Sequence, residues 1–321
     1  MMQKWKSLWG TMSESLDTNL KLLNMVIGLC KGSAELPKDL LKLGYIIHYI
    51  EYPFTNSSGE QVKPEIIIKS FHSKNTLLFE FKTGESIDLN QLQRYSRVTL
   101  EDIKQRAWVE TQCLGTFDIV YLCLSDKLTE IVKGFKSSSF QPPLLSYDRS
   151  IMKLALNNFK EERLNVLFKK GIAVKFDLIP TDFVPFHQES RDWEFAEALI
   201  PIVIQCMLNN ESRIVLESVC KELIPQWNNL SHFEQSLYEN KILDLINLAS
   251  IHDFKDYLLR PSKEQHAKTR GKREWEIINN PLITQPYKHS KVFLKLQNIQ
   301  RNFIEFLKTG NKTIPQEELP F

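Results

Sequence analysis

Two carboxylates, an ammonium group and an amide are close together in one short stretch of this 321-residue chain. In chain order they are Glu65, Glu80, Lys82 and Gln91, with Tyr95 four residues further on. Mg²⁺ is usually held in proteins by one or two carboxylates, together with waters and phosphate oxygens of the substrate. An ammonium group beside such a metal positions the attacking water and stabilises developing negative charge. These residue types therefore indicate metal-dependent hydrolysis of a phosphodiester.

Residues 65–82 predict a β-hairpin, because two runs of β-branched and aromatic residues flank a polar stretch. With a four-residue turn at 72–75, Glu65 falls opposite Lys82. Side chains alternate along a strand, so Glu65, Glu80 and Lys82 share one face. Glu65 and Glu80 are then diagonal neighbours, with backbones about 7–8 Å apart. Two glutamates at that separation can reach one cation.

A plainer interpretation is a solvated surface, on which each Glu–Lys pair contributes only about 0.2–1 kcal/mol. The neighbouring residues favour burial instead, because both strands are otherwise nearly continuous apolar runs. A buried face that carries two glutamates needs a partner for their charge, and a cation is one.

A helix is predicted to begin near Asp88, with Leu89, Leu92 and Tyr95 at helical spacing. Gln91 and Tyr95 are four residues apart and lie on the same general face. Two alternatives stay open: Asp88 and Gln91 also form a capping-box pattern, and Tyr95 is explained equally well as a core residue.

This arrangement resembles the signature of the PD-(D/E)xK nuclease superfamily, and Gln91 with Tyr95 resembles the QxxxY motif of its RecB-type branch. The resemblance covers roughly residues 30–125. It implies that Glu65 and Glu80 bind Mg²⁺ or Mn²⁺ and that Lys82 is the catalytic lysine. Gln91 and Tyr95 would orient the site or contact the DNA backbone.

The chain departs from the family pattern at two points. Glu65 stands where the family usually has aspartate, and its extra methylene changes the reach of the carboxylate. The acid or histidine that an upstream helix often supplies has no clear match. Glu35 is the best placed acid, Glu51 is a second candidate, and His48 is more typical of a packed core residue.

The predicted elements give an α/β fold with a restriction-endonuclease-like core, a mixed four-stranded sheet flanked by helices. The expected order is a helix at 36–43, a strand at 45–52, the hairpin, a helical region at 88–108, a strand at 117–124 and a helix at 126–135. The last strand follows a helix, so it should pair in parallel.

Serines followed by Pro142 and Pro143 predict a linker at 136–143. We therefore expect a nuclease-like domain at 1–138 and a mainly helical domain at 139–321. Its expected helices are 149–170, 194–209, 212–227, 233–249 and 289–307, with a short strand at 171–179. This domain would bind DNA, a partner protein or a second copy of the chain, and a helix-turn-helix within 212–249 is one form it could take.

Basic residues predict DNA contacts in two places. The stretch 260–275 carries six of them, which could neutralise phosphates and release counterions. The predicted helix that contains Gln91 carries a second group of basic residues. The residues selected as DNA-binding are Arg94, Arg97, Lys268, Arg270, Lys272 and Arg273. The alternative is a solvated charge run.

Composition limits the remaining possibilities. A net charge of +2 implies no general attraction to polyanions. Five cysteines without a CxxC pair favour reduced thiols in a cytoplasmic protein and disfavour an iron–sulfur cluster. The apolar runs are too short to cross a bilayer, and the first residues lack the apolar core of a signal peptide, so no membrane association is expected.

The function expected from the sequence is a metal-dependent deoxyribonuclease, which in this superfamily implies a role in antiviral defence, restriction or repair. The alternative is a non-catalytic nucleic-acid-binding or assembly subunit on the same fold. A third hypothesis is a helical interaction protein with a merely structural sheet. The pattern does not separate endonuclease from exonuclease action, single- from double-stranded substrates, or DNA from RNA.

Overall fold

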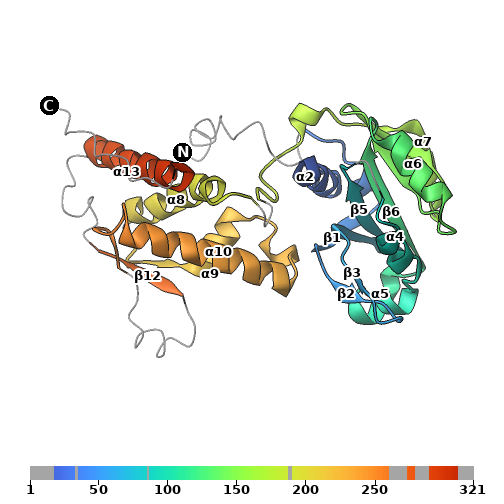
Figure 1. Cartoon of the computed structure of the whole chain (residues 1–321), viewed down its shortest axis with the longest axis horizontal. Coiled ribbons are helices and arrows are strands. Elements are labelled where there is room, and N and C mark those ends of the chain that lie inside the picture. The colour runs from blue at the N-terminus through green and yellow to red at the C-terminus, as the bar shows by residue number, and fades with distance from the viewer. Residues whose placement is uncertain are drawn as a thin grey trace. The chain divides into compact units, whose positions relative to one another are not determined.

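A computed structural model describes residues 18–32, 35–84, 87–186, 190–259, 273–278 and 289–309 (Figure 1). The chain divides into two compact units. The first comprises Met1–Pro185 and Asn229–Phe233, and the second comprises Phe186–Asn228 and Glu234–Phe321. Within these described stretches, no helix is both long and apolar enough to cross a membrane.

The first unit contains a seven-stranded mixed sheet, which confirms an α/β fold but extends the expected four strands by three. In sheet order the strands are β1 (Tyr45–Ile50), β4 (Ile66–Ser70), β5 (Asn75–Lys82), β6 (Thr116–Leu124), β7 (Leu144–Tyr147), β8 (Ile151–Leu156) and β9 (Ile172–Ala173). The strands β5, β6 and β7 are parallel to one another, as predicted for β6, and the other neighbours pair antiparallel. A separate short hairpin joins β2 (Phe54–Thr55) to β3 (Gln61–Val62).

Helices pack on both faces of this sheet (Figure 1). They are α2 (Thr18–Lys31), α3 (Asp39–Lys42), α4 (Leu89–Ser96), α5 (Leu100–Arg106), α6 (Leu128–Lys136) and α7 (Glu162–Lys170). One apolar core joins α4, α5 and α6 to the sheet through Leu78, Leu92, Ile103, Tyr121 and Phe135. Every residue of β5 except Lys82 is buried. The expected burial of this strand on both faces is therefore confirmed.

The hairpin register differs from the prediction by two residues. Ser70 pairs with Asn75 and Ile66 pairs with Phe79, so the turn is 71–74. The expected pairing of Glu65 with Lys82 is therefore wrong, and Glu65 lies beside Glu80 instead. A shift of two residues preserves the face on which the side chains of the paired residues lie. Glu65 precedes those pairs, and its backbone N–H donates to Phe79 O at 2.9 Å.

The register shifts because Asn75 belongs to the strand, although its residue type is typical of a turn. Its side chain is fully buried. Tyr45 donates a hydrogen bond to Asn75 Oδ1 at 2.8 Å, and Asn75 Nδ2 donates to Thr116 Oγ1 at 2.8 Å. These contacts come from strands distant in sequence, and a local pattern cannot reveal them.

Gly44 ends the segment that contains α3, as expected for a helix C-terminus. Its φ is 77°, and a Cβ atom at this position would lie 2.2 Å from His72 Nδ1. Gly44→Ala is therefore expected to destabilise the protein by about 1–3 kcal/mol. A lower denaturation midpoint at unchanged m-value would show this effect. Gly59→Ala is the control for positive φ alone, because no atom lies within 4 Å of the added Cβ.

The chain after residue 138 continues the first unit. The boundary expected at 138 falls between α6 and β7, and Pro142 and Pro143 lead directly into β7. The helix expected at 149–170 is wrong in its first half, which forms β8 before α7 begins. The exposure of β8 residues alternates along its first half, and this period of two is typical of a strand with one covered face.

The second unit contains the helices α8 (Asp192–Leu208), α9 (Leu216–Leu223), most of α10 (His232–Ile251) and α13 (His289–Thr309). These correspond to the helices expected there. A small antiparallel sheet was not expected; its order is β10 (Arg213–Val215), β12 (Glu274–Ile277) and β11 (Leu258–Leu259). The link between α9 and α10 spans 224–231, which is longer than the three- to four-residue turn of a helix-turn-helix.

Candidate functional site

The candidate site lies where the end of β5 meets α4. Glu80 and Lys82 are two residues apart on β5 and therefore extend from the same face. The side chain of Asp88 caps α4 by accepting a hydrogen bond from the Asn90 backbone N–H at 2.8 Å. The helix then presents Gln91 and Tyr95, one turn apart, to that face of the strand.

Four of the predicted site residues form one hydrogen-bonded network around Glu80, whose side chain is almost fully buried. Glu80 Oε1 accepts hydrogen bonds from Lys82 Nζ at 3.0 Å and from Gln91 Nε2 at 2.8 Å. Glu80 Oε2 accepts a hydrogen bond from the Tyr95 hydroxyl at 2.9 Å. Lys82 Nζ also donates to Gln91 Oε1 at 2.6 Å. The network fixes the positions of an ammonium group and a carboxylate together.

The two simpler explanations for the helical residues now separate. Gln91 directs its amide to Glu80 and Lys82, so the network and not a capping box accounts for its side chain. Tyr95 is a core residue, as the plainer interpretation held, and it also donates to the carboxylate. Burial raises the pKa of Tyr95 well above its usual value, and the neighbouring Glu80 charge adds to this. Tyr95 is therefore a neutral hydrogen-bond donor.

Glu65 lies just before β4, and its carboxyl group has no such support. Its backbone N–H donates to Phe79 O at 2.9 Å, which places the half-buried side chain beside the network. Burial raises the pKa of Glu65 to about 8, and the charges of Glu80 and Glu51 add to the rise. In the described part of the chain, no hydrogen bond or ion pair reaches this carboxyl group. It needs either a proton or a cation.

Glu51 supplies a third carboxylate from the neighbouring strand. It follows β1 directly, is 6% exposed, and donates its backbone N–H to Glu65 O at 2.9 Å. Its side chain accepts a hydrogen bond from Lys63 Nζ at 2.8 Å. Its φ of 49° is unusual for a residue with a side chain, and such strained conformations are concentrated at functional sites.

The structure thus distinguishes the two upstream acids that the sequence offered. Glu51 is adjacent to Glu65, whereas Glu35 is exposed in the bend between α2 and α3. No described contact connects Glu35 to Glu65 or Glu80. The sequence feature that favours Glu51 as the upstream acid is its position at the end of an apolar strand. That strand pairs with the strand that begins directly after Glu65.

The donor set for a metal consists of carboxylate oxygens, which suit Mg²⁺ or Mn²⁺. Among the residues that the structure describes, no three His, Cys, Asp or Glu side chains gather closely enough to form a metal site by themselves. One or two carboxylates with waters and substrate oxygens are sufficient for Mg²⁺.

Three of the six predicted DNA-binding residues lie in the described part of the chain. Arg94 Nη2 lies 3.9 Å from Asp88, and Arg97 forms an ion pair of 2.7 Å with Glu60. Arg273 directly precedes β12 in the second unit and donates to Asn240 Oδ1 at 3.4 Å. The other three, Lys268, Arg270 and Lys272, lie outside the described residues.

A protein-family model matches residues 18–184, which is more than half of the 321-residue chain. The chain belongs to the MJECL32 domain family. The MJECL32 domain includes all seven strands of the large sheet and the whole Glu80 network. No curated protein matches the chain, and no solved structure does.

The Tyr95 hydroxyl is expected to contribute to the stability of the MJECL32 domain. Tyr95→Phe removes one hydrogen bond from the buried Glu80 carboxylate, so the free energy of unfolding should fall by about 1.5–3 kcal/mol. Urea denaturation followed by circular dichroism measures this change. Tyr49→Phe is the matched control, because Tyr49 is only half-buried on β1. Equal stability of Tyr95→Phe and wild type would contradict the network.

Proposed function

We propose that the MJECL32 domain of this chain is a metal-dependent nuclease that hydrolyses phosphodiester bonds of DNA. The observation that carries the proposal is the network of Glu80, Lys82, Gln91 and Tyr95 beside the unpaired carboxyl group of Glu65. A solvated surface does not account for it, because Glu80 is 4% exposed. A catalytic carboxylate–lysine pair accounts for a network that is buried in this way.

Mg²⁺ or Mn²⁺ fits the donors that are present. Glu65 and Glu80 would hold the ion, and the cation would replace the proton that Glu65 otherwise needs. When bound, the ion would supply Lewis-acid stabilisation of charge on the phosphate and a more acidic water.

Lys82 is the residue best placed to act on the nucleophile. An ammonium group has three N–H donors, and two of them bind Glu80 and Gln91. The third is available to hold a water molecule or a phosphate oxygen. Gln91 binds both Lys82 and Glu80 and therefore restricts the rotamers of the pair.

The order of the elements supports a relationship to the PD-(D/E)xK superfamily. The four expected strands are neighbours in the order β1-β4-β5-β6, and α4 follows β5 with its Gln and Tyr facing the sheet. We propose that these strands are a nuclease core and that β7, β8 and β9 extend it. By the same resemblance, the domain would act in defence, restriction or repair.

One observation favours the alternative, a nucleic-acid-binding subunit without catalytic activity. Both oxygens of Glu80 already accept hydrogen bonds from side chains, and these donors compete with a metal. A bound cation must therefore share Glu80 with Lys82, Gln91 and Tyr95. Activity measurements separate the two functions.

The test is incubation of the purified chain with labelled linear, circular and single-stranded DNA in Mg²⁺, Mn²⁺ or EDTA. We expect cleavage with either metal and none in EDTA, and cleavage of the circle would indicate endonuclease action. Glu80→Ala should abolish cleavage, while Glu130→Ala on the exposed face of α6 should not. DNA binding without cleavage in any metal would favour the alternative, and cleavage in EDTA would contradict the metal requirement.

A further inference from the structure

A gap in the large sheet lies beside the first half of β6. β7 pairs with β6 only from Tyr121 onward, and the Tyr121 backbone N–H donates to Pro143 O at 3.0 Å. Pro142 and Pro143 lead into β7, and proline has no backbone N–H to donate. The hydrogen-bond ladder between β6 and β7 therefore stops at this point, and the preceding residues of β6 have a free edge.

The free edge of β6 presents unpaired backbone groups. In a strand, the side to which the backbone N–H and C=O point alternates with each residue. The Thr116 N–H donates to Lys74 O on the β5 side, and the Tyr121 N–H points to the β7 side. By this alternation, the backbone groups of Phe117 and Ile119 face the gap.

One of these backbone groups has a partner, because Lys160 Nζ donates to Phe117 O at 2.8 Å. In the part of the chain that the structure describes, no hydrogen bond reaches the Phe117 N–H or the N–H and C=O of Ile119. Ile119 is only 4% exposed, and unpaired backbone groups that are shielded from water cost free energy. A ligand with backbone-like donors and acceptors would remove this cost.

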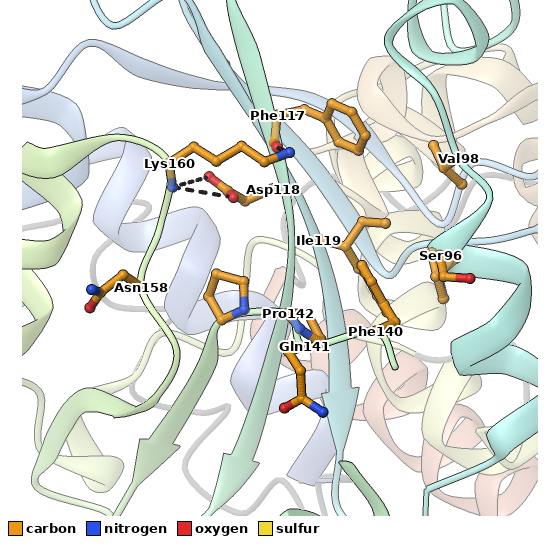
Figure 2. Close-up of a pocket in the computed structure, with 12 residues that line it drawn as sticks. Ser96, Val98, Phe117, Asp118, Ile119, Phe140, Gln141, Pro142, Asn158 and Lys160 are labelled. Atoms are coloured by element: carbon orange, nitrogen blue, oxygen red, sulfur yellow. Dashed lines mark hydrogen bonds between the residues drawn. The ribbon is translucent and has the colours of Figure 1, made fainter. Parts of the chain in front are cut away.

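A cavity of about 270 Å³ adjoins the free edge (Figure 2). Polar and apolar groups both line it, and Ser96, Gln141 and Asn158 are exposed at its rim. The volume is close to the lower end of the range for small-molecule sites. The space therefore suits the end of a peptide and not a long segment.

The charge that faces the gap is positive. Asp118 turns its carboxylate away from Ile119 and accepts the backbone N–H of Lys160 at 3.2 and 3.3 Å (Figure 2). The Lys160 side chain forms no ion pair with any residue that the structure describes. Its ammonium group has three donors, of which one binds Phe117 O. The remaining donors and the Phe117 N–H are suited to a carboxylate.

We propose that this gap binds the carboxyl terminus of an extended peptide from a partner protein. In an antiparallel arrangement, the terminal carboxylate would accept hydrogen bonds from the Phe117 N–H and the Lys160 ammonium group. The residue two positions earlier in the peptide would pair with the N–H and C=O of Ile119. Strand addition at a sheet edge and capture of a terminal carboxylate are both known modes of peptide recognition. An internal segment fits less well, because Pro143 and Lys160 close the two ends of the free edge.

The inference goes beyond the proposed nuclease activity and does not depend on it, because binding is measured in EDTA and without DNA. A chain without nuclease activity could still bind the peptide, and a nuclease could fail to bind it.

The test is an NMR titration of the full chain in EDTA with a pool of N-acetylated tetrapeptides, random in sequence, that have a free terminal carboxylate. The same pool with amidated termini is the control. We expect the free acids to shift the amide signals of Phe117 and Ile119 and to bind about tenfold or more tightly than the amides. Unchanged signals at about 5 mM peptide, or equal affinity of the two pools, would overturn the proposal.

Two lysine variants extend the test to the residues. Lys160→Gln should weaken binding of the free acids by about tenfold, whereas Lys153→Gln on the exposed face of β8 should not. Undiminished binding by a folded Lys160→Gln protein, or an equal loss in Lys153→Gln, would refute the assignment of the carboxylate to Lys160. The amide spectrum of each variant shows whether it is folded. If Lys160→Gln does not fold, the comparison of the two peptide pools on the wild type decides.

Discussion

Replacing Lys82 by alanine is expected to lower the rate of metal-dependent DNA cleavage by about a thousandfold, the scale typical of a lost transition-state donor. The lysine holds the nucleophile through its third N–H, and Glu80 and Gln91 fix its position. The loss should appear in kcat more than in KM, because the ammonium acts on charge that develops during the reaction. Single-turnover rates at saturating Mg²⁺ measure it directly.

The controls for this prediction are available in the same domain. Glu130 and Lys133 on α6 form an exposed pair at 2.7 Å, similar in type to the buried Glu80–Lys82 pair at 3.0 Å. Lys133→Ala should therefore retain full activity. Lys82→Gln keeps a hydrogen-bond donor for Glu80, and it guards against a loss caused by misfolding. A Lys82→Ala protein with wild-type melting temperature and less than a tenfold loss of rate would exclude a catalytic role for Lys82.

The site could be predicted largely because its residues are close in sequence. Glu80 and Lys82 lie on one strand and Gln91 and Tyr95 lie on the next helix, so the periods of strand and helix alone place each pair on one face. The apolar runs of the hairpin also predicted the burial of β4 and β5. These features depend on neighbouring residues, which a sequence pattern records.

The features that escaped prediction depend on contacts between distant segments. Asn75 is a strand residue because Tyr45 and Thr116 bind its side chain, and the hairpin register follows from that. β8 was predicted as helix, since its pairing with β7 and β9 is a property of the folded sheet. The position of Glu51 beside Glu65 was not predicted, because its left-handed φ is not indicated by its residue type.

Magnesium is expected to stabilise the wild-type chain and to have little effect on Glu65→Gln. A ligand that binds only the folded state at about a hundred times its Kd contributes about 2.7 kcal/mol. For a domain of this size, the melting temperature should then rise by about 5 °C or more. Glu65→Gln removes a charged ligand, so most of this rise should disappear. Differential scanning calorimetry with and without Mg²⁺ measures the shift, and Glu130→Gln is the matched control.

The pH dependence of this effect follows from the carboxyl group of Glu65. Its pKa rises from 4.5 to about 8 on folding without metal, so the unfolded chain loses this proton at lower pH than the folded chain. The free energy of unfolding should therefore fall as pH rises between these values, and Glu65→Gln should remove that fall. Mg²⁺ must displace the same proton, so its stabilising effect on the wild type should grow from about pH 6 to about pH 9. A Mg²⁺ shift that is equal in Glu65→Gln, or independent of pH, would show that Glu65 does not bind the metal.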